Sequence, residues 1–156
     1  MTDRLLVVLR HAKSDWSGGE PGRLRPLAPR GRRQAPEAGR WLAAHLPDLD
    51  VALVSPATRT RQTWDLVAAE LASPPETRVV ANLYAASLDE LLDVVAGVER
   101  GRTVLVAHNP GVEELVEELT GLAVEMKTSA LAVVDLGTGA LLAHGRPPTA
   151  VDLPSR

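Results

Sequence analysis

Three apolar runs of this sequence end in side chains that bind or attack anions. The runs cover residues 4–9, 51–55 and 103–107. Arginine binds phosphate or carboxylate oxygens through a planar fork, and imidazole can attack phosphorus or carry a proton. Neighbouring parallel strands would bring their carboxyl ends, and these side chains, to one edge of a sheet. The side chains are Arg10 and His11 after the first run, Arg59 after or near the second, and His108 after the third.

Two imidazoles and two guanidiniums in one pocket would repel each other unless an anion lay between them. A phosphate dianion fits this arrangement, because arginines can hold its non-bridging oxygens while one imidazole attacks in line and the other donates a proton. The sequence has no carboxylate cluster and no spacing of two histidines with an acid that would suggest a metal, so we expect a metal-free mechanism without a cofactor. We interpret the remaining histidines, His45 and His144, as structural.

Two of the junctions also carry signals for the start of a helix. Ser55 is followed by Pro56, and Asn109 is followed by Pro110. Serine and asparagine are favoured as N-caps and proline as the first helical residue. The free N–H groups at such a helix start attract anions, so the sequence predicts caps at Ser55 and Asn109 beside the phosphate.

Short apolar runs alternate with segments of helical periodicity, which is typical of an α/β protein. The runs are nearly continuous in Val and Leu, as expected for strands covered on both faces of a largely parallel sheet. We expect strands at 4–9, 51–55, 78–81, 103–107 and 130–136, and helices at 31–46, 57–72, 87–99 and 111–121.

Proline and low apolar content set two of the expected boundaries. Pro36 falls inside the first helical segment, where proline loses a hydrogen bond and clashes with the preceding turn, so we expect a start near Arg33 or a kink. Residues 147–156 contain few apolar side chains, and we expect a mobile tail that follows a single domain over 1–146.

Composition narrows the class of protein. The 156 residues suit one domain, and the 17 basic against 20 acidic side chains give no indication of a nucleic-acid partner or an anionic membrane. The absence of cysteine excludes disulfides and thiolate chemistry. Without an apolar segment of membrane-spanning length or a signal peptide, we expect a cytoplasmic protein, and the oligomeric state stays open.

Three motifs, in order and spread over nearly the whole chain, resemble those of the histidine phosphatase superfamily, which has the phosphoglycerate mutase-like fold. "LRHAKSDWS" is similar to its R-H-G-x-S-x-W-N signature, "SPATRTRQT" to its S-P-x-x-R-x-x-Q-T segment, and "LVAHNPGVEEL" to its second-histidine motif. The short length, the alanine of "RHAK", the "RPLAPRG" segment and the Asn-Pro pair resemble the SixA-type branch of protein phosphohistidine phosphatases.

The resemblance implies a three-layer α/β/α sandwich around a mostly parallel central sheet. It also implies that His11 is the nucleophile that becomes phosphorylated, with no metal and no cofactor. The phosphoryl group would be held by Arg10, Arg59 and His108, and further substrate contacts would come from Ser17 and Asn109.

The sequence departs from the family pattern at three places. Ala12 replaces a glycine next to the nucleophile, and Ser17 stands where many members have a phosphate-contacting asparagine. Residues 79–87, "VVANLYAAS", contain no carboxylate where many relatives place a glutamate proton donor. Asp15 is close enough in sequence to replace that donor, although a loop carboxylate paired with an arginine is an equal interpretation.

A missing proton donor favours a substrate with a weakly basic leaving group. Protonation of a leaving alkoxide contributes about 100- to 10,000-fold in rate, whereas the imidazole of phosphohistidine leaves more easily. We therefore expect a phosphatase for phosphohistidine on a protein. The alternatives are a phosphatase of small phosphorylated metabolites or nucleotides with the same mechanism, and a phosphate-binding module without turnover. The loop at 20–33, rich in Pro, Gly and Arg, either lines the site or is a plain connector.

Overall fold

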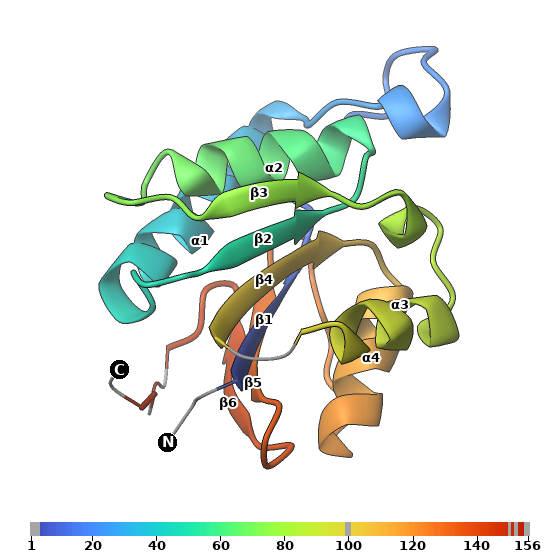
Figure 1. Cartoon of the computed structure of the whole chain (residues 1–156). Helices are drawn as coiled ribbons and strands as arrows, with labels where there is room; N and C mark the ends of the chain where they lie inside the picture. The colour runs from blue at the N-terminus through green and yellow to red at the C-terminus, as the bar shows by residue number, and fades with distance from the viewer. Residues whose placement is uncertain (1–3, 99–100, 150, 152, 155–156) are drawn as a thin grey trace.

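The chain folds around a central six-stranded sheet with helices on both faces (Figure 1). This architecture comes from a computed structural model that describes residues 4–98, 101–149, 151 and 153–154. The strand order is β3-β2-β4-β1-β5-β6. The strands are β1 Arg4–Arg10, β2 Val51–Val54, β3 Glu76–Val79, β4 Gly101–Ala107, β5 Leu131–Asp135 and β6 Leu141–Gly145.

Four of the six strands run parallel. β1 pairs with β4, β4 with β2 and β2 with β3 in parallel, while β5 and β6 add an antiparallel edge beside β1. The α/β class and the mostly parallel sheet are therefore confirmed. Strands β2, β4 and β1, which carry the three motifs, are immediate neighbours, so their carboxyl ends lie together.

The helices form one layer on each side of the sheet (Figure 1). Alternate residues of β1 explain this arrangement: Leu5, Val7 and Leu9 belong to one apolar cluster with α1 and α2, and Leu6 and Val8 belong to the other with α3 and α4. The three-layer prediction is thus confirmed. The helices are α1 Pro29–His45, α2 Thr58–Ala68, α3 Leu88–Ala96 and α4 Gly111–Thr120, with short 3₁₀ turns η1 Gly22–Leu24 and η2 Ala81–Leu83.

The first helix differs from its prediction. It begins at Pro29, four residues before Arg33, and continues through Pro36 to His45. A proline at the first helical position costs no hydrogen bond, because that N–H would be unpaired in any case. The buried apolar face, which includes Trp41 and Leu42, offsets the one bond that Pro36 removes.

One other boundary also differs. β3 covers Glu76–Val79 where we expected 78–81, because its pairing with β2 begins at Val51↔Glu76 and ends at Val54↔Val79. The tail at 147–156 stays a prediction, and of its described residues Val151 and Leu153 pack against the apolar core. Positions 150, 152 and 155–156 lie outside the described residues.

No helix within the described part of the chain combines the length and apolar content that crossing a membrane requires.

Candidate active site

Two histidines meet at the carboxyl edge of the sheet. His11 follows β1 and His108 follows β4, and the register of these strands places Arg10 beside Ala107. The ring centroids of the two histidines are 5.4 Å apart, with an angle of 56° between the ring planes. Both Arg10 and Arg59 act electrostatically on both imidazoles. The structure therefore brings together the four side chains that the sequence singles out.

The backbone fixes the tautomer of His11. Its Nδ1 lies 2.7 Å from the carbonyl oxygen of Ala12, and because a carbonyl can only accept, Nδ1 carries the proton. Nε2 of the neutral ring is left with a free lone pair. Burial, the main cause, together with the charges of Arg59, Arg10 and Lys13, lowers the pKa of His11 to about 4. At neutral pH the ring is thus uncharged, with an unprotonated Nε2.

The second imidazole is held from β2. Nε2 of His108 lies 2.7 Å from Oγ of Ser55, while its Nδ1 is buried and has no hydrogen-bond partner. The ring of Tyr84 contacts His108 edge-on, with centroids 5.7 Å apart. Burial, followed by the charges of Arg59, His11 and Arg10, lowers the pKa of His108 to about 3. A buried nitrogen without a partner is suited to a phosphoryl oxygen, whose negative charge would favour protonation of this ring.

The two arginines are held by backbone carbonyls. Nη1 of Arg10 donates to the carbonyl oxygen of Met126 at 3.0 Å, and its Nε is buried without a partner. Nη1 of Arg59 donates to the carbonyl oxygen of Gly22 at 2.6 Å. Burial is the largest cause that lowers the pKa of both guanidiniums, and Glu113 counteracts it at Arg10. An anion between these groups would offset the positive charge that they concentrate.

The second motif also positions the nucleophile loop. Oγ1 of Thr63 accepts a hydrogen bond from the backbone N–H of Ala12 at 3.0 Å and donates to the carbonyl oxygen of Arg59 at 2.7 Å. Oε1 of Gln62 accepts from the backbone N–H of Leu27 at 2.8 Å. One helix therefore fixes the loop that carries His11 and supplies Arg59.

Ser55 is not the cap of α2, contrary to the prediction. The helix begins at Thr58, with Ala57 at the N-cap position. The hydroxyl of Ser55 faces His108, and the carbonyl oxygen of Ser55 accepts from Oγ1 of Thr60 at 2.8 Å. The serine thus orients an imidazole and does not start the helix.

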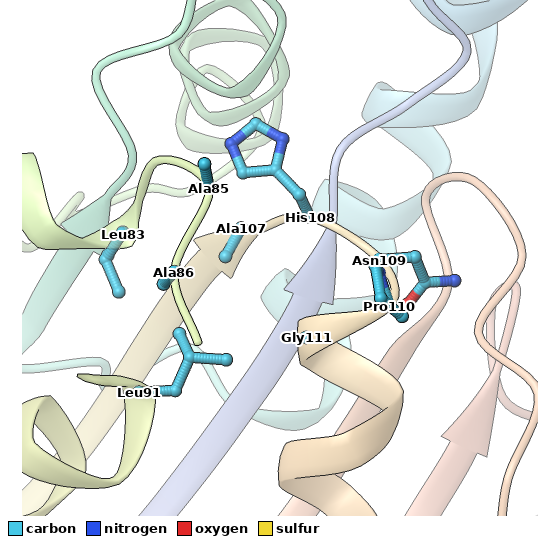
Figure 2. Close-up of a pocket in the computed structure, with 9 residues that line it drawn as sticks. All are labelled: Leu83, Ala85, Ala86, Leu91, Ala107, His108, Asn109, Pro110 and Gly111. Carbon is cyan, nitrogen blue, oxygen red and sulfur yellow. The ribbon is translucent and has the colours of Figure 1, made fainter. Parts of the chain in front are cut away.

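Asn109 is not a helix cap either. Helix α4 begins at Gly111 with Pro110 at the N-cap position, and Nδ2 of Asn109 donates to the carbonyl oxygen of Met126 at 2.8 Å. Figure 2 shows this side chain pointing away from the ring of His108. The predicted substrate contact from Asn109 therefore gains no support, and its amide instead helps to hold the segment that anchors Arg10.

Asp15 and Ser17 bond to each other. Oδ1 of Asp15 accepts from the backbone N–H of Ser17 at 2.8 Å and from its hydroxyl at 2.6 Å. These hydrogen bonds lower the pKa of Asp15, whose side chain is half-buried. A carboxyl that stays ionised is a poor proton donor, so the geometry favours a loop carboxylate over a general acid. Ser17 offers its hydroxyl to Asp15, and neither residue is hydrogen-bonded to the histidines.

A small pocket lies beside His108 (Figure 2). Its volume is about 160 Å³, and it is bounded by the segment after η2 and the start of α4. Ala85 and His108 both line this pocket (Figure 2). None of the residues that line this pocket is acidic, in agreement with the carboxylate-free stretch in the sequence.

Sequence reasoning missed the residues that support the site from a distance. Met126 accepts from Arg10 and Asn109 through its carbonyl, and its N–H donates to Oε2 of Glu113 at 2.7 Å. A backbone hub of this kind leaves no signal in side-chain types. Tyr84 could have been noticed as the only tyrosine, located in the stretch without a carboxylate. Within the described part of the chain, no group of three or more His, Cys, Asp or Glu residues could hold a metal ion.

Comparisons with known proteins agree with this geometry. The family model of the histidine phosphatase superfamily (branch 1) matches residues 6–84. The chain is 38% identical over 117 residues to an uncharacterised protein, Rv1276c of Mycobacterium tuberculosis strain H37Rv, covering 74% of this chain and 72% of that protein. It is 41% identical over 86 residues to a 2,3-bisphosphoglycerate-dependent phosphoglycerate mutase of Bradyrhizobium sp. strain BTAi1, covering 52% of this chain and 42% of the mutase.

Solved structures with the same fold include three that bear the SixA name. One, from Agrobacterium tumefaciens and named as a candidate phosphohistidine phosphatase SixA, superposes with a TM-score of 0.79 at 28% identity, covering 86% of this chain and 93% of that one. Another, the protein histidine phosphatase SixA complexed with tungstate, has a TM-score of 0.76 at 23% identity, covering 91% and 94%. At that second level of identity the likeness concerns the fold alone.

Proposed function

Because the chain belongs to the histidine phosphatase superfamily, we propose that it is a metal-independent phosphatase that removes phosphate from phosphohistidine on a protein. The observation that carries the proposal is the pair of imidazoles 5.4 Å apart, with His11 held as the tautomer whose Nε2 is free to attack. Arg10 and Arg59 would neutralise the phosphoryl oxygens, so that the chemistry needs no further cation.

In the first step, the lone pair on Nε2 of His11 attacks the phosphorus. The new P–N bond forms as the bond from phosphorus to the substrate nitrogen breaks, and that electron pair stays on the substrate ring. A substrate ring protonated at its other nitrogen leaves as neutral imidazole. The transfer therefore needs no proton from the protein, which suits a pocket without a carboxylate.

In the second step, water attacks the phosphorus of phospho-His11. The P–N bond breaks, its electron pair returns to Nε2, and both hydrogens of the water remain on the released dihydrogen phosphate. His108, protonated at Nδ1 while the phosphoryl group is bound, would donate to one of its oxygens. The cycle ends with His11 neutral and ready for another turnover.

A phosphatase of small phosphorylated metabolites is the second candidate. The identity to a phosphoglycerate mutase favours it, although this chain spans less than half of that enzyme. Such a substrate releases an alkoxide, which requires a proton from an acid close to the leaving oxygen. No carboxyl lines the pocket beside His108, and the hydrogen bonds that lower the pKa of Asp15 make it a poor donor. This lack of a carboxyl donor is the reason that we place phosphohistidine first.

A rapid-quench experiment with a ³²P-labelled phosphohistidine peptide tests the proposal. Quenching in alkali, which preserves P–N bonds, should trap label on the wild-type protein and none on His11→Asn. His45→Asn is the matched control, because His45 is exposed at the end of α1, and this variant should label and turn over like the wild type. Phosphate release by His11→Asn would refute the mechanism. Tight phosphate binding without release at any pH would instead indicate a binding module.

The two candidate substrates are separated by their kcat/KM values. The phosphohistidine peptide should be preferred over a panel of sugar and nucleotide monophosphates under the same conditions. A higher kcat/KM for any phosphate ester would replace the protein substrate with a metabolite while leaving the covalent mechanism intact.

A further inference from the structure

The segment between β1 and α1 forms an exposed rim beside the active site. We call residues 15–25 the docking rim; its prominent side chains are Trp16, Arg23, Leu24 and Arg25. In Figure 1 this blue segment with η1 projects at the side toward which the arrowheads of β2, β3 and β4 point. The rim therefore stands where any large substrate would approach the histidines.

The docking rim exposes apolar surface that the fold does not use. Trp16 is 68% exposed and Leu24 is 57% exposed, so the rim carries two of the four most exposed large apolar side chains among the described residues. Tryptophan and arginine are enriched among residues that dominate protein–protein binding energies. Such exposure indicates contact with a partner.

Trp16 is held in place by a cation. The guanidinium of Arg25 lies 3.8 Å from the centroid of the Trp16 ring, a stacking contact of about 0.5–1 kcal/mol at an exposed site. The stack orders two long side chains before any partner arrives, which lowers the entropy cost of binding. Surface side chains that are already ordered in this way favour the binding of a partner.

Direct contacts connect the docking rim to the phosphate cradle. Arg59 donates to the carbonyl oxygen of Gly22 within η1, and the guanidinium of Arg23 lies 5.7 Å from the centroid of the Tyr84 ring. Tyr84 in turn contacts His108. A partner on the rim would therefore bind next to residues that contact Arg59 and Tyr84.

Charge around the rim identifies the kind of partner. Residues 13–33 contain six basic and two acidic side chains, although the whole chain has a net charge of −3. The ion pairs Arg40–Glu70 and Arg78–Glu76 involve none of these basic side chains. Their positive field would attract a negatively charged surface and repel a basic one.

We propose that the docking rim binds an acidic protein surface that carries the phosphohistidine. This inference rests on the proposed function and names the surface by which the substrate protein is chosen. Arg23 and Arg25 would face carboxylates that flank the phosphohistidine, and Trp16 would cover the apolar part of the contact. A small metabolite held between the two histidines and the two arginines would not reach this outer surface.

Two phosphohistidine peptides and one small substrate test the rim. The peptides have the same sequence, except that one carries Asp and Glu on both sides of the phosphohistidine and the other carries Asn and Gln. Phosphoramidate is the small substrate that reports the chemistry alone. The variants are Arg25→Gln and Trp16→Ala, and Arg40→Gln is the control that removes one positive charge from the exposed face of α1.

The wild type should prefer the acidic peptide by about tenfold in kcat/KM, and added salt should reduce this preference. In Arg25→Gln and Trp16→Ala, the ratio of kcat/KM for the acidic peptide to that for phosphoramidate should fall severalfold, whereas Arg40→Gln should keep the wild-type ratio. An unchanged ratio in both rim variants, or equal rates on the two peptides, would overturn the docking rim while leaving the proposed phosphatase intact. Failure of the wild type to hydrolyse any of the three substrates would instead refute the proposed function.

Discussion

The charge state of the two imidazoles predicts how protein stability depends on pH. The pKa of His11 is lowered from 6.5 to about 4, which at 1.36 kcal/mol per pKa unit disfavours the protonated folded state by about 3 kcal/mol. The unfolded chain keeps an ordinary histidine and therefore binds more protons between pH 6.5 and pH 4. The free energy of unfolding is thus fully retained above pH 6.5 and falls as the pH drops through this window.

Replacement of His11 by asparagine removes the titrating group and should flatten this dependence. Between pH 7.5 and pH 4.5, linkage predicts that the wild type loses roughly 2 to 3 kcal/mol more than His11→Asn. Urea denaturation of both proteins at matched pH values measures the difference, and the remaining carboxylates and histidines largely cancel in the comparison. Parallel curves for the two proteins would refute the buried neutral His11.

A bound dianion should reverse the effect. Sulfate stays doubly charged throughout the same window, and between Arg10 and Arg59 it would favour protonated imidazoles, especially at the unpartnered Nδ1 of His108. Nitrogen NMR of the histidine side chains should therefore show His108 neutral at pH 5 without sulfate and titrating at higher pH with it. A ring that titrates near 6.5 in the free protein would contradict the electrostatic reasoning from the start.

Three further substitutions follow from single contacts. Thr63→Val leaves the buried N–H of Ala12 without an acceptor and should lower the free energy of unfolding by about 1–3 kcal/mol, measured by urea denaturation, together with kcat. Gly31→Ala would ordinarily stabilise a helix, but its new methyl group would collide with the carbonyl of Lys13, so Tm should fall. Gly19→Ala is the control, because no atom lies within 4 Å of its new methyl group, and it should leave Tm nearly unchanged. Ala85→Glu places a carboxyl in the pocket that His108 lines and should raise kcat/KM for glycerol phosphate at least about tenfold, with a smaller change for phosphoramidate. No gain would show that a missing acid does not limit ester hydrolysis.

The ends of the strands could be predicted from the sequence, because an apolar run followed by polar side chains is a local pattern. Arg10 ends a buried strand, and His11, Arg59 and His108 follow a buried strand or the turn after it, so their meeting required only that the strands be parallel neighbours. The alternation of strands and helices predicts the parallel direction. The order of the strands, which places β2, β4 and β1 side by side, is known only from the structure.

Helix starts at the same junctions were mispredicted because tertiary contacts compete for the capping side chains. Ser55 is a good N-cap in isolation, yet its hydroxyl pairs with His108, which is 53 residues away. Asn109 is likewise drawn to a carbonyl 17 residues further along the chain. A propensity describes an isolated segment, and at an active site the polar side chains serve partners that local sequence does not reveal.

In the reaction proposed for this site, the nucleophile and the leaving group are both imidazoles. This likeness explains why the site can work without a carboxyl donor. Transfer of a phosphoryl group from one imidazole to another changes neither the bond type nor the net charge, so the protein needs to hold a dianion and two rings in line without driving off a strong base. The neutral, buried His11 and the cradle of Arg10 and Arg59 meet that need, and the carboxylate-free pocket beside His108 adds nothing to it. Selectivity must then come from outside the cradle, because every phosphohistidine presents the same reacting group. The exposed, positively charged surface around Trp16 and Arg25 is where such a distinction between substrate proteins can be made.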